Sequence, residues 1–234
     1  MNRGGLGGPV KLLVLIGAAL LGVAIGLHAF STPELPPEVG TVPDAAAVAA
    51  TKRASASPGH PAVTVRPGLS GRQSARPAGQ TVAVPAGKVA PVALTLTGRG
   101  TAPVIPEGVT KGALDLPGSV STLGWWTGGV GLEAASGSVV IAGHVDSAVQ
   151  GRGYFAVLQD VSPGTPVTVQ GSDGVQRRYV VTGRRNYRKA DGLPASVFDQ
   201  SVQSRLVLIT CTGSFNQATR SYEDNLVVYA VPAS

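Results

Sequence analysis

Cysteine and histidine are scarce in this sequence of 234 residues, which contains one cysteine, Cys211, and three histidines. One cysteine cannot form a disulfide within the chain, and with the single histidine after residue 97 it cannot complete a four-ligand structural zinc site. A G-x-S-x-G nucleophile elbow, a glycine-rich phosphate loop and an H-E-x-x-H zinc motif are also missing. These absences argue against a disulfide scaffold, a zinc protein, a phosphate-loop enzyme and the common serine hydrolases.

Aromatic residues are almost absent from the first 97 positions, where Phe30 is the only one of the eleven in the chain. Because aromatic side chains carry much of the apolar area that a core buries, we expect the folded domain to be residues 98–234. Net charge divides at the same place: eight Lys and Arg accompany three Asp and Glu before residue 98, and eleven accompany ten after it. A nearly neutral domain gives little support to nucleic-acid binding, so no nucleic-acid partner is predicted.

One uncharged apolar run, Leu12–Phe30, is long enough to cross a membrane, because nineteen helical residues nearly span a hydrocarbon core of about 30 Å. Arg3 and Lys11 precede the run without any acidic residue, which favours a cytoplasmic N-terminus. We therefore predict that residues 1–30 are a cytoplasmic N-terminus and a single transmembrane anchor in the cell membrane, with the rest of the chain extracytoplasmic. A cleaved signal peptide is the alternative, although no clear A-x-A site follows the run.

The next segment, residues 31–97, contains ten prolines, fourteen alanines and no aromatic residue. A segment of this composition cannot bury enough apolar surface to offset the entropy that is lost when it becomes ordered. We predict a disordered Pro/Ala-rich linker that carries the domain away from the membrane.

After Gly98 the sequence changes to short β-type runs separated by Gly-Gly, Pro-Gly and Asp-Gly turn signals, with one short helix expected over residues 153–159. This pattern predicts a mostly β domain that closes into a barrel or forms a sandwich. The expected strands are Pro103–Ile105, Ser138–Ala142, Pro166–Gln170, Arg178–Thr182, Leu206–Thr210 and Leu226–Ala230.

Cys211 and His144 occupy matching positions, each just after a strand-like apolar run. Cys211 follows Leu206–Thr210, and His144 follows Val139–Ala142 with one glycine between. A residue at the end of a buried strand is held rigidly yet can face a groove, and a thiol nucleophile needs a partner that takes its proton. The pair is therefore a candidate nucleophile and acid–base partner. Taken singly, each has a plainer interpretation, an inert core cysteine and a structural histidine.

Arg220 is the only cation after Cys211, and acyl transfer needs positive charge or N–H donors at the developing oxyanion. We therefore predict Arg220 as the oxyanion stabiliser; the alternative is a surface arginine that pairs with Glu223 or Asp224. Four other basic residues form a local cluster, which we interpret as a solvated loop or, less favoured, as a contact for an anionic substrate or the cell wall. They are Arg184, Arg185, Arg188 and Lys189.

Two segments resemble the signature motifs of sortases. Val139–Ser147, VVIAGHVDS, is similar to the histidine motif of that family, and Leu206–Cys211, LVLITC, is similar to its strand end at the cysteine. The resemblance covers about residues 100–232 and is closest to the class F sortases of actinobacteria. Supporting similarity lies in residues 124–126, 153–158 and 222–230.

The resemblance implies an eight-stranded β-barrel with one or two short helices, and an enzyme that cleaves an LPXTG-like sorting signal of secreted proteins. It implies that Cys211 forms a thioester, that His144 protonates the leaving amine, and that the acyl group then passes to an amine of a cell-wall precursor. One departure lies in residues 222–225, which read Tyr-Glu-Asp-Asn where class F chains often read Tyr-Arg-Asp-Asn. Glu223 thus occupies the place of the arginine, and Arg220 would have to substitute for it. We predict the sorting-signal peptide, the cell-wall amine and the membrane as partners, and neither a cofactor nor a metal ligand.

Two other functions stay open at this point. An L,D-transpeptidase is also a β-protein with a cysteine and a histidine, but its S-H-G-C run is missing and 67 residues separate His144 from Cys211. A non-catalytic, membrane-tethered β-barrel that binds wall or protein, such as a degenerate sortase, is the alternative to an enzyme. Alkylation of Cys211 distinguishes the non-catalytic barrel from an enzyme, because an inert core thiol resists alkylation whereas a thiol in an active-site groove reacts.

Overall fold

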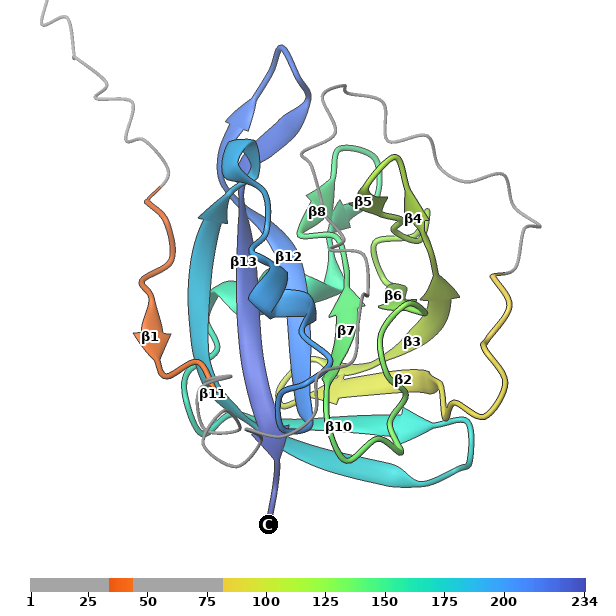
Figure 1. Ribbon diagram of the computed structural model, residues 1–234. Coiled ribbons are helices and arrows are strands. Elements are labelled where there is room, and N and C mark those ends of the chain that lie inside the picture. The colour runs from red at the N-terminus through yellow and green to blue at the C-terminus, as the bar shows by residue number, and fades with distance from the viewer. Residues whose placement is uncertain (1–33, 44–81) are drawn as a thin grey trace, which may run out of the picture. The chain divides into compact units, whose positions relative to one another are not determined.

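β-Strands make up most of the chain that the computed structural model describes, residues 34–43 and 82–234 (Figure 1). Nine of them form one sheet: β1 (Val39–Gly40), β2 (Pro91–Leu96), β3 (Gly100–Glu107), β6 (Leu123–Trp126), β7 (Ser138–Ala142), β10 (Pro166–Gly171), β11 (Gln176–Arg188), β12 (Arg205–Asn216) and β13 (Ser221–Pro232). Two small hairpins pair β4 (Val109–Thr110) with β5 (Ala113–Leu114), and β8 (Asp146–Ser147) with β9 (Gly151–Arg152). Three short 3-10 helices are η2 (Tyr154–Gln159), η3 (Lys189–Asp191) and η4 (Ala195–Phe198).

The large sheet closes on itself because its long strand β11 pairs along both edges. The strands follow the order β1-β11-β10-β2-β3-β6-β7-β12-β13, and β13 pairs again with β11. The closed ring therefore contains eight strands, and β1 is added to β11 outside the ring through the pairing of Val39 with Arg184. A closed barrel removes exposed strand edges. The predicted mostly β, eight-stranded barrel with short helices is thus confirmed.

Both faces of one wall of the barrel, formed by β6, β7, β12 and β13, are buried. On its inner face Ile141 and Leu208 belong to the main core inside the barrel. On its outer face Val140 and Val207 belong to a second cluster, which Val197 of η4 helps to cover. Burial on both sides explains why these strands read as continuous apolar runs rather than as alternating patterns.

The barrel begins before Gly98, the start that the aromatic content predicts. β2 pairs with both β3 and β10, and the hydroxyl of Tyr154 ties the β2–β3 hairpin to η2. This hydroxyl accepts a hydrogen bond from Leu96 N at 3.0 Å and lies 3.1 Å from Leu94 O and 2.6 Å from Gly100 O, to which it donates. Composition conceals the strand because its six residues, PVALTL, include no aromatic and follow a Pro/Ala-rich stretch.

A short segment of the predicted linker, residues 34–43, lies along β11. The buried Arg184 donates from Nε to Pro37 O at 2.8 Å, and Arg185 donates from Nη1 to Val39 O at 2.9 Å. Desolvation lowers the pKa of Arg184. Two members of the basic cluster thus lie in a strand and bind backbone carbonyls, instead of lying in a solvated loop.

The predicted transmembrane anchor, Leu12–Phe30, lies outside the described residues, as does the linker between residues 44 and 81. Within the two described ranges, no helix is both long and apolar enough to cross a membrane.

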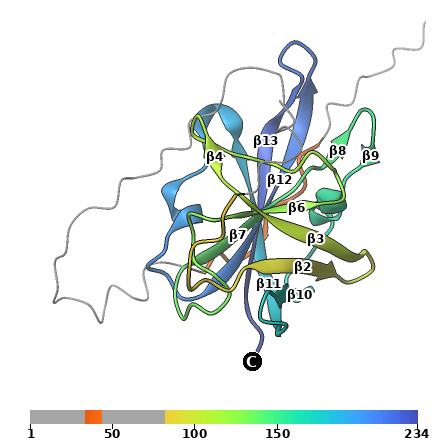
Figure 2. The same ribbon diagram turned by 90° about the vertical axis from the view of Figure 1, so that its right-hand side faces the viewer.

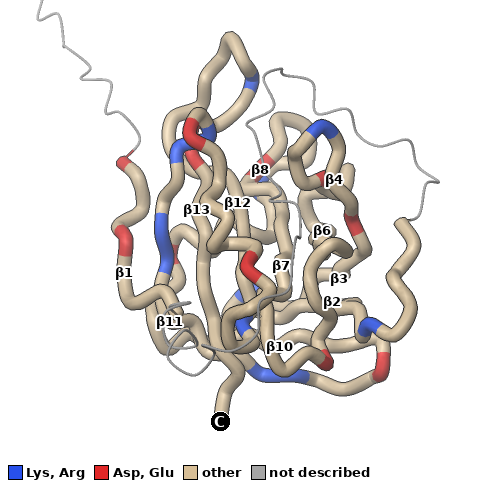
Figure 3. Tube along the Cα trace, viewed as in Figure 1, with Lys and Arg blue, Asp and Glu red and all other residues tan. Residues whose placement is uncertain are grey.

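Charged residues of both signs are interspersed over the described part of the chain (Figure 3). Asp and Glu positions lie among the Lys and Arg positions in this view, and neither sign occupies a whole side. This distribution matches the near balance of acidic and basic residues after residue 97.

Candidate active site

The pairing of β7 with β12 brings Cys211 and His144 to the same end of the barrel wall. The two strands are parallel neighbours, and their last registered pair is Ala142 with Ile209 (Figures 1 and 2). The contact continues one residue further, where Gly143 N donates to Ile209 O at 3.0 Å. His144 and Cys211 each stand two residues beyond the last pair. The two residues that the sequence singles out therefore lie on adjacent chains at one level.

Cys211 continues the outer face of this wall. Side chains alternate between the faces of a strand, so residues two apart share a face. Ile209 and Ala142 both belong to the outer cluster, and Cys211 follows Ile209 by two residues. The six residues before Cys211 in β12 are buried, whereas Cys211 itself is half-buried. The thiol thus stands where the doubly buried part of the strand ends, which is unlike the setting of an inert core cysteine.

The imidazole of His144 is oriented by the backbone. Its Nε2 lies 2.9 Å from the carbonyl oxygen of Pro117. A carbonyl can only accept a hydrogen bond, so this contact assigns a hydrogen to Nε2 and leaves Nδ1 as the ring nitrogen that can exchange a proton. Gly143, which precedes His144, packs closely against the core: a Cβ at this glycine would lie 2.5 Å from Leu123 Cδ2 and 2.9 Å from Phe155 Cδ2. The chain that carries His144 is therefore held against the core.

A lysine that sequence analysis did not select lies at the sulfur. Asn225 of β13 is registered opposite Cys211 of β12, and Tyr187 of β11 is registered opposite Asn225. Two residues after Tyr187 the chain reaches Lys189, whose Nζ lies 3.3 Å from Cys211 Sγ. The only sequence signal for this residue was its membership of the basic cluster.

Arg220, the predicted oxyanion stabiliser, lies in the turn between β12 and β13 and is exposed. Its backbone φ of 51° falls in the left-handed region. It makes no hydrogen bond or ion pair with any residue of the described ranges. Glu223 is exposed as well, whereas Asp224 is buried, and desolvation raises the pKa of Asp224 although the charge of Arg188 opposes the change. The alternative reading, in which Arg220 pairs with Glu223 or Asp224, is not what the structure shows.

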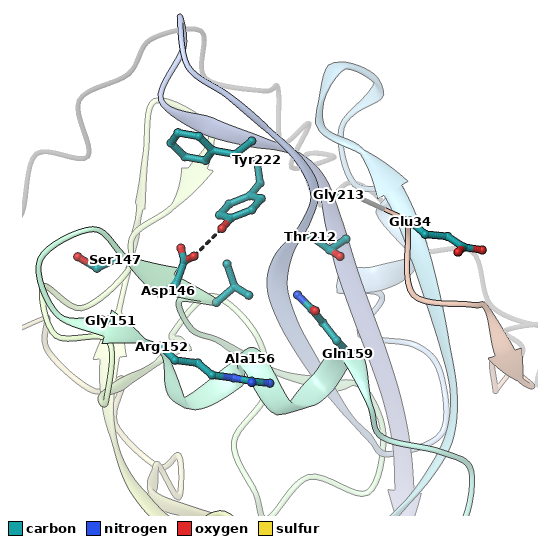
Figure 4. A pocket seen from close by; sticks show the side chains of 12 residues that line it. Glu34, Asp146, Ser147, Gly151, Arg152, Ala156, Gln159, Thr212, Gly213 and Tyr222 are labelled. Atoms are coloured by element: carbon teal, nitrogen blue, oxygen red, sulfur yellow. Dashed lines mark hydrogen bonds between the residues drawn. The ribbon is translucent and has the colours of Figure 1, made fainter. Parts of the chain in front are cut away.

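A pocket of about 630 Å³ adjoins the Cys–His pair without including it (Figure 4). Thr212 and Val145 line the pocket, and they are the next residues along the chain after Cys211 and His144. Gly213, the residue after Thr212, lines it as well. The pocket therefore begins directly beside Cys211 and His144 along both chains.

Tyr222 and Asp146 meet in this pocket. The Tyr222 hydroxyl donates to Asp146 Oδ2 at 2.5 Å (Figure 4). Burial, and next the hydrogen bond to Asp146, raise the pKa of Tyr222 to about 12. The bond connects β13 with β8, which begins two residues after His144. No group of three or more His, Cys, Asp or Glu side chains in the described part of the chain is placed to hold a metal ion.

Comparison with known proteins gives one family. The sequence matches the sortase domain family over residues 96–233. The chain is also similar to solved structures, among them a lid mutant of sortase A from Corynebacterium diphtheriae (22% identity over 62% of this chain and 71% of that one, TM-score 0.44) and sortase C-1 from Actinomyces oris (15%, 61% and 73%, 0.47). Sortase A from Listeria monocytogenes is another similar structure, with 16% identity over 62% of this chain and 88% of that one and a TM-score of 0.42. No curated protein matches the sequence. Because the family match covers more than half of its length, the chain belongs to the sortase family.

Proposed function

We propose that this sortase is a cysteine transpeptidase that cleaves an LPXTG-like sorting signal of secreted proteins and transfers the acyl group to a cell-wall amine. Membership of the family supports the transpeptidase class. The observation that carries the residue assignment is the register of β7 against β12, which sets Cys211 and His144 at the same end of two neighbouring strands.

The proposed reaction consists of two acyl transfers. The Cys211 sulfur, as thiolate, attacks the carbonyl carbon of the signal's threonine, and the bond from that carbon to the next residue's nitrogen breaks. His144 gives a proton to the leaving amine, and the acyl group stays on sulfur as a thioester. The incoming amine then attacks the thioester, His144 takes its proton, and the thiolate leaves. The Nδ1 atom serves both steps, because Nε2 is bonded to the Pro117 carbonyl.

The class F assignment and the membrane location belong to the same proposal. Residues 124–126 and 222–230, which carry the class F resemblance, lie in β6 and β13 of the barrel. The apolar run Leu12–Phe30, preceded by Arg3 and Lys11, supports a single-pass anchor with the barrel outside the cell.

Cleavage of a fluorogenic LPXTG peptide by the full chain tests this function. The wild-type chain should cut between threonine and glycine and should form a ligated product when an amine is added. Cys211→Ala should abolish both products without changing thermal unfolding, and His144→Ala should do nearly the same.

Three other results would change the assignment. Cleavage that persists in Cys211→Ala would refute the nucleophile. If the wild-type chain cleaves nothing and Cys211 resists alkylation, the non-catalytic binding module is the better reading. If it cleaves nothing but Cys211 is reactive, the chain recognises a different signal.

A further inference from the structure

The cation that contacts Cys211 is not the one that the sequence predicts. Lys189 Nζ lies 3.3 Å from Cys211 Sγ and 3.0 Å from Ser221 Oγ, and the lysine side chain is half-buried. We propose that Lys189, rather than Arg220, is the catalytic cation. Its ammonium stabilises negative charge on the sulfur and then on the oxyanion that forms when sulfur adds to the substrate carbonyl. The inference rests on the proposed function and identifies the cation of that same site.

Three paired strands determine where Lys189 lies. β13 runs between β11 and β12, so its residue Asn225 is registered with Tyr187 on one side and with Cys211 on the other. Neighbouring strands lie about 4.8 Å apart, which separates β11 from β12 by roughly 10 Å. A lysine and a cysteine side chain together bridge that distance. Because β11 ends at Arg188, the lysine stands at the same end of the barrel wall as the thiol.

Ser221 orients the ammonium. Its hydroxyl accepts a hydrogen bond from Lys189 Nζ and donates to Tyr222 O at 3.2 Å. An ammonium has three N–H donors, of which one is directed to the sulfur and one to this hydroxyl. The third remains for a substrate oxygen, since Lys189 forms no ion pair with a carboxylate among the described residues.

The charge near the sulfur is therefore not cancelled by a direct partner. The charges of Arg188 and Lys189 both lower the pKa of the Asp224 carboxyl, against the larger effect of burial, which raises it. Arg188 is registered with Asp224 and is exposed. Within the described residues, Lys189 is the cation that contacts Cys211. A compact ammonium on a flexible stem suits a charge that moves from sulfur to a nearby oxygen.

Alkylation of the full chain tests the contact without any assumption about the substrate. Because the chain has a single cysteine, iodoacetamide reports on Cys211 alone. Lys189→Met removes the charge at similar length, Lys189→Arg keeps it, and Arg220→Met is the matched control. At neutral pH we expect alkylation of Lys189→Met to slow by about 10-fold or more, because the ammonium in contact with Sγ stabilises negative charge on the attacking sulfur. Lys189→Arg should stay within about 3-fold of wild type, and Arg220→Met should be unchanged.

Turnover of a cleavable sorting peptide supplies the second measurement. Lys189→Met should lower kcat/KM on the order of 10²–10³-fold, as the loss of an oxyanion contact does, with partial recovery in Lys189→Arg. Wild-type alkylation and turnover in Lys189→Met would overturn the inference, and so would the same losses in Arg220→Met. If the wild-type chain cleaves no peptide, the proposed signal fails, but the alkylation series still decides whether Lys189 acts on the sulfur.

Discussion

A methyl group added at Gly153 should displace His144, the proposed acid–base residue, because it would collide with the backbone of that residue. An alanine Cβ at this position would lie 2.2 Å from His144 O and 2.9 Å from His144 C. The Gly153 backbone has φ −74° and ψ 164°, which alanine adopts without strain, so the effect is steric alone. Because the obstacle is backbone rather than a flexible side chain, the His144 segment has to move by about 1 Å to reach ordinary contact.

The size of the effect follows from that shift. A misplacement of about 1 Å in a catalytic group can cost about 100-fold in rate, and overpacking of this kind costs about 1–3 kcal/mol of stability. We therefore expect Gly153→Ala to lower kcat/KM for the sorting peptide by about 100-fold. Alkylation of Cys211 should change by less than about 3-fold, because the substitution leaves the Lys189 contact in place.

The assay measures peptide cleavage, alkylation of Cys211 and thermal unfolding in Gly153→Ala and in a control variant. Gly108→Ala is the matched control, since a Cβ there meets its first neighbour, Asp115 Oδ2, at 3.6 Å. The control should behave as wild type in all three measurements. Wild-type kcat/KM and wild-type stability in Gly153→Ala would refute the reasoning, because they would mean that the backbone behind His144 yields without consequence.

Two further predictions concern tyrosine hydroxyls. Tyr154→Phe should lower the free energy of unfolding by about 1–3 kcal/mol, because the buried Leu96 N–H loses its acceptor. Urea denaturation measures the loss, and a change below about 0.5 kcal/mol would contradict the role given to this hydroxyl. Tyr222→Phe should reduce the loss of stability in alkali. The pKa of Tyr222 is raised to about 12 in the folded state, which therefore keeps a proton that the unfolded chain releases near pH 10. The stability that this tyrosine contributes below about pH 10 is consequently lost as the pH rises toward 12. Urea midpoints at about pH 9 and about pH 11 test the sign, and an equal fall in variant and wild type would count against it.

The fold class was predictable because the doubly buried wall leaves a strong trace in the sequence. The predicted strand Ser138–Ala142 is β7, and the predicted strand Leu206–Thr210 lies within β12. Strand pairing leaves no comparable trace. The predicted strands Pro166–Gln170 and Arg178–Thr182 lie within β10 and β11, but their pattern does not indicate that β11 continues to Arg188 and closes the barrel against β13.

The start of the barrel was harder to locate, for a compositional reason. Aromatic content marks a core only where aromatics occur, and β2 contributes Leu94 and Leu96 instead. Both leucines are buried inside the barrel, yet a run of six residues after a Pro/Ala-rich stretch carries too little periodicity to indicate a strand.

The candidate site divides in the same way. Cys211 and His144 could be selected because each follows an apolar run, a local property of the sequence. Lys189 could not, because it approaches the sulfur only through the β11–β13–β12 register, and it is 22 residues away from Cys211 along the chain. Closeness in sequence favoured Arg220 instead, nine residues from Cys211, but the turn between β12 and β13 leaves its side chain exposed.

The three groups share one structural origin, which bears on how accurately they are placed. Each is positioned by a strand of the barrel: His144 follows β7, Cys211 lies within β12 after its buried part, and Lys189 follows β11. Groups on paired strands, or directly after them, are held more accurately than groups on free loops, because the backbone ladder and the packed core resist displacement. The contact with the Pro117 carbonyl then orients the imidazole ring of His144, and the contact with Ser221 orients the ammonium of Lys189. The pairing of β7 with β12, whose apolar runs are visible in the sequence, thus brings His144 and Cys211 to one end of the barrel, and the β11–β13–β12 register adds Lys189.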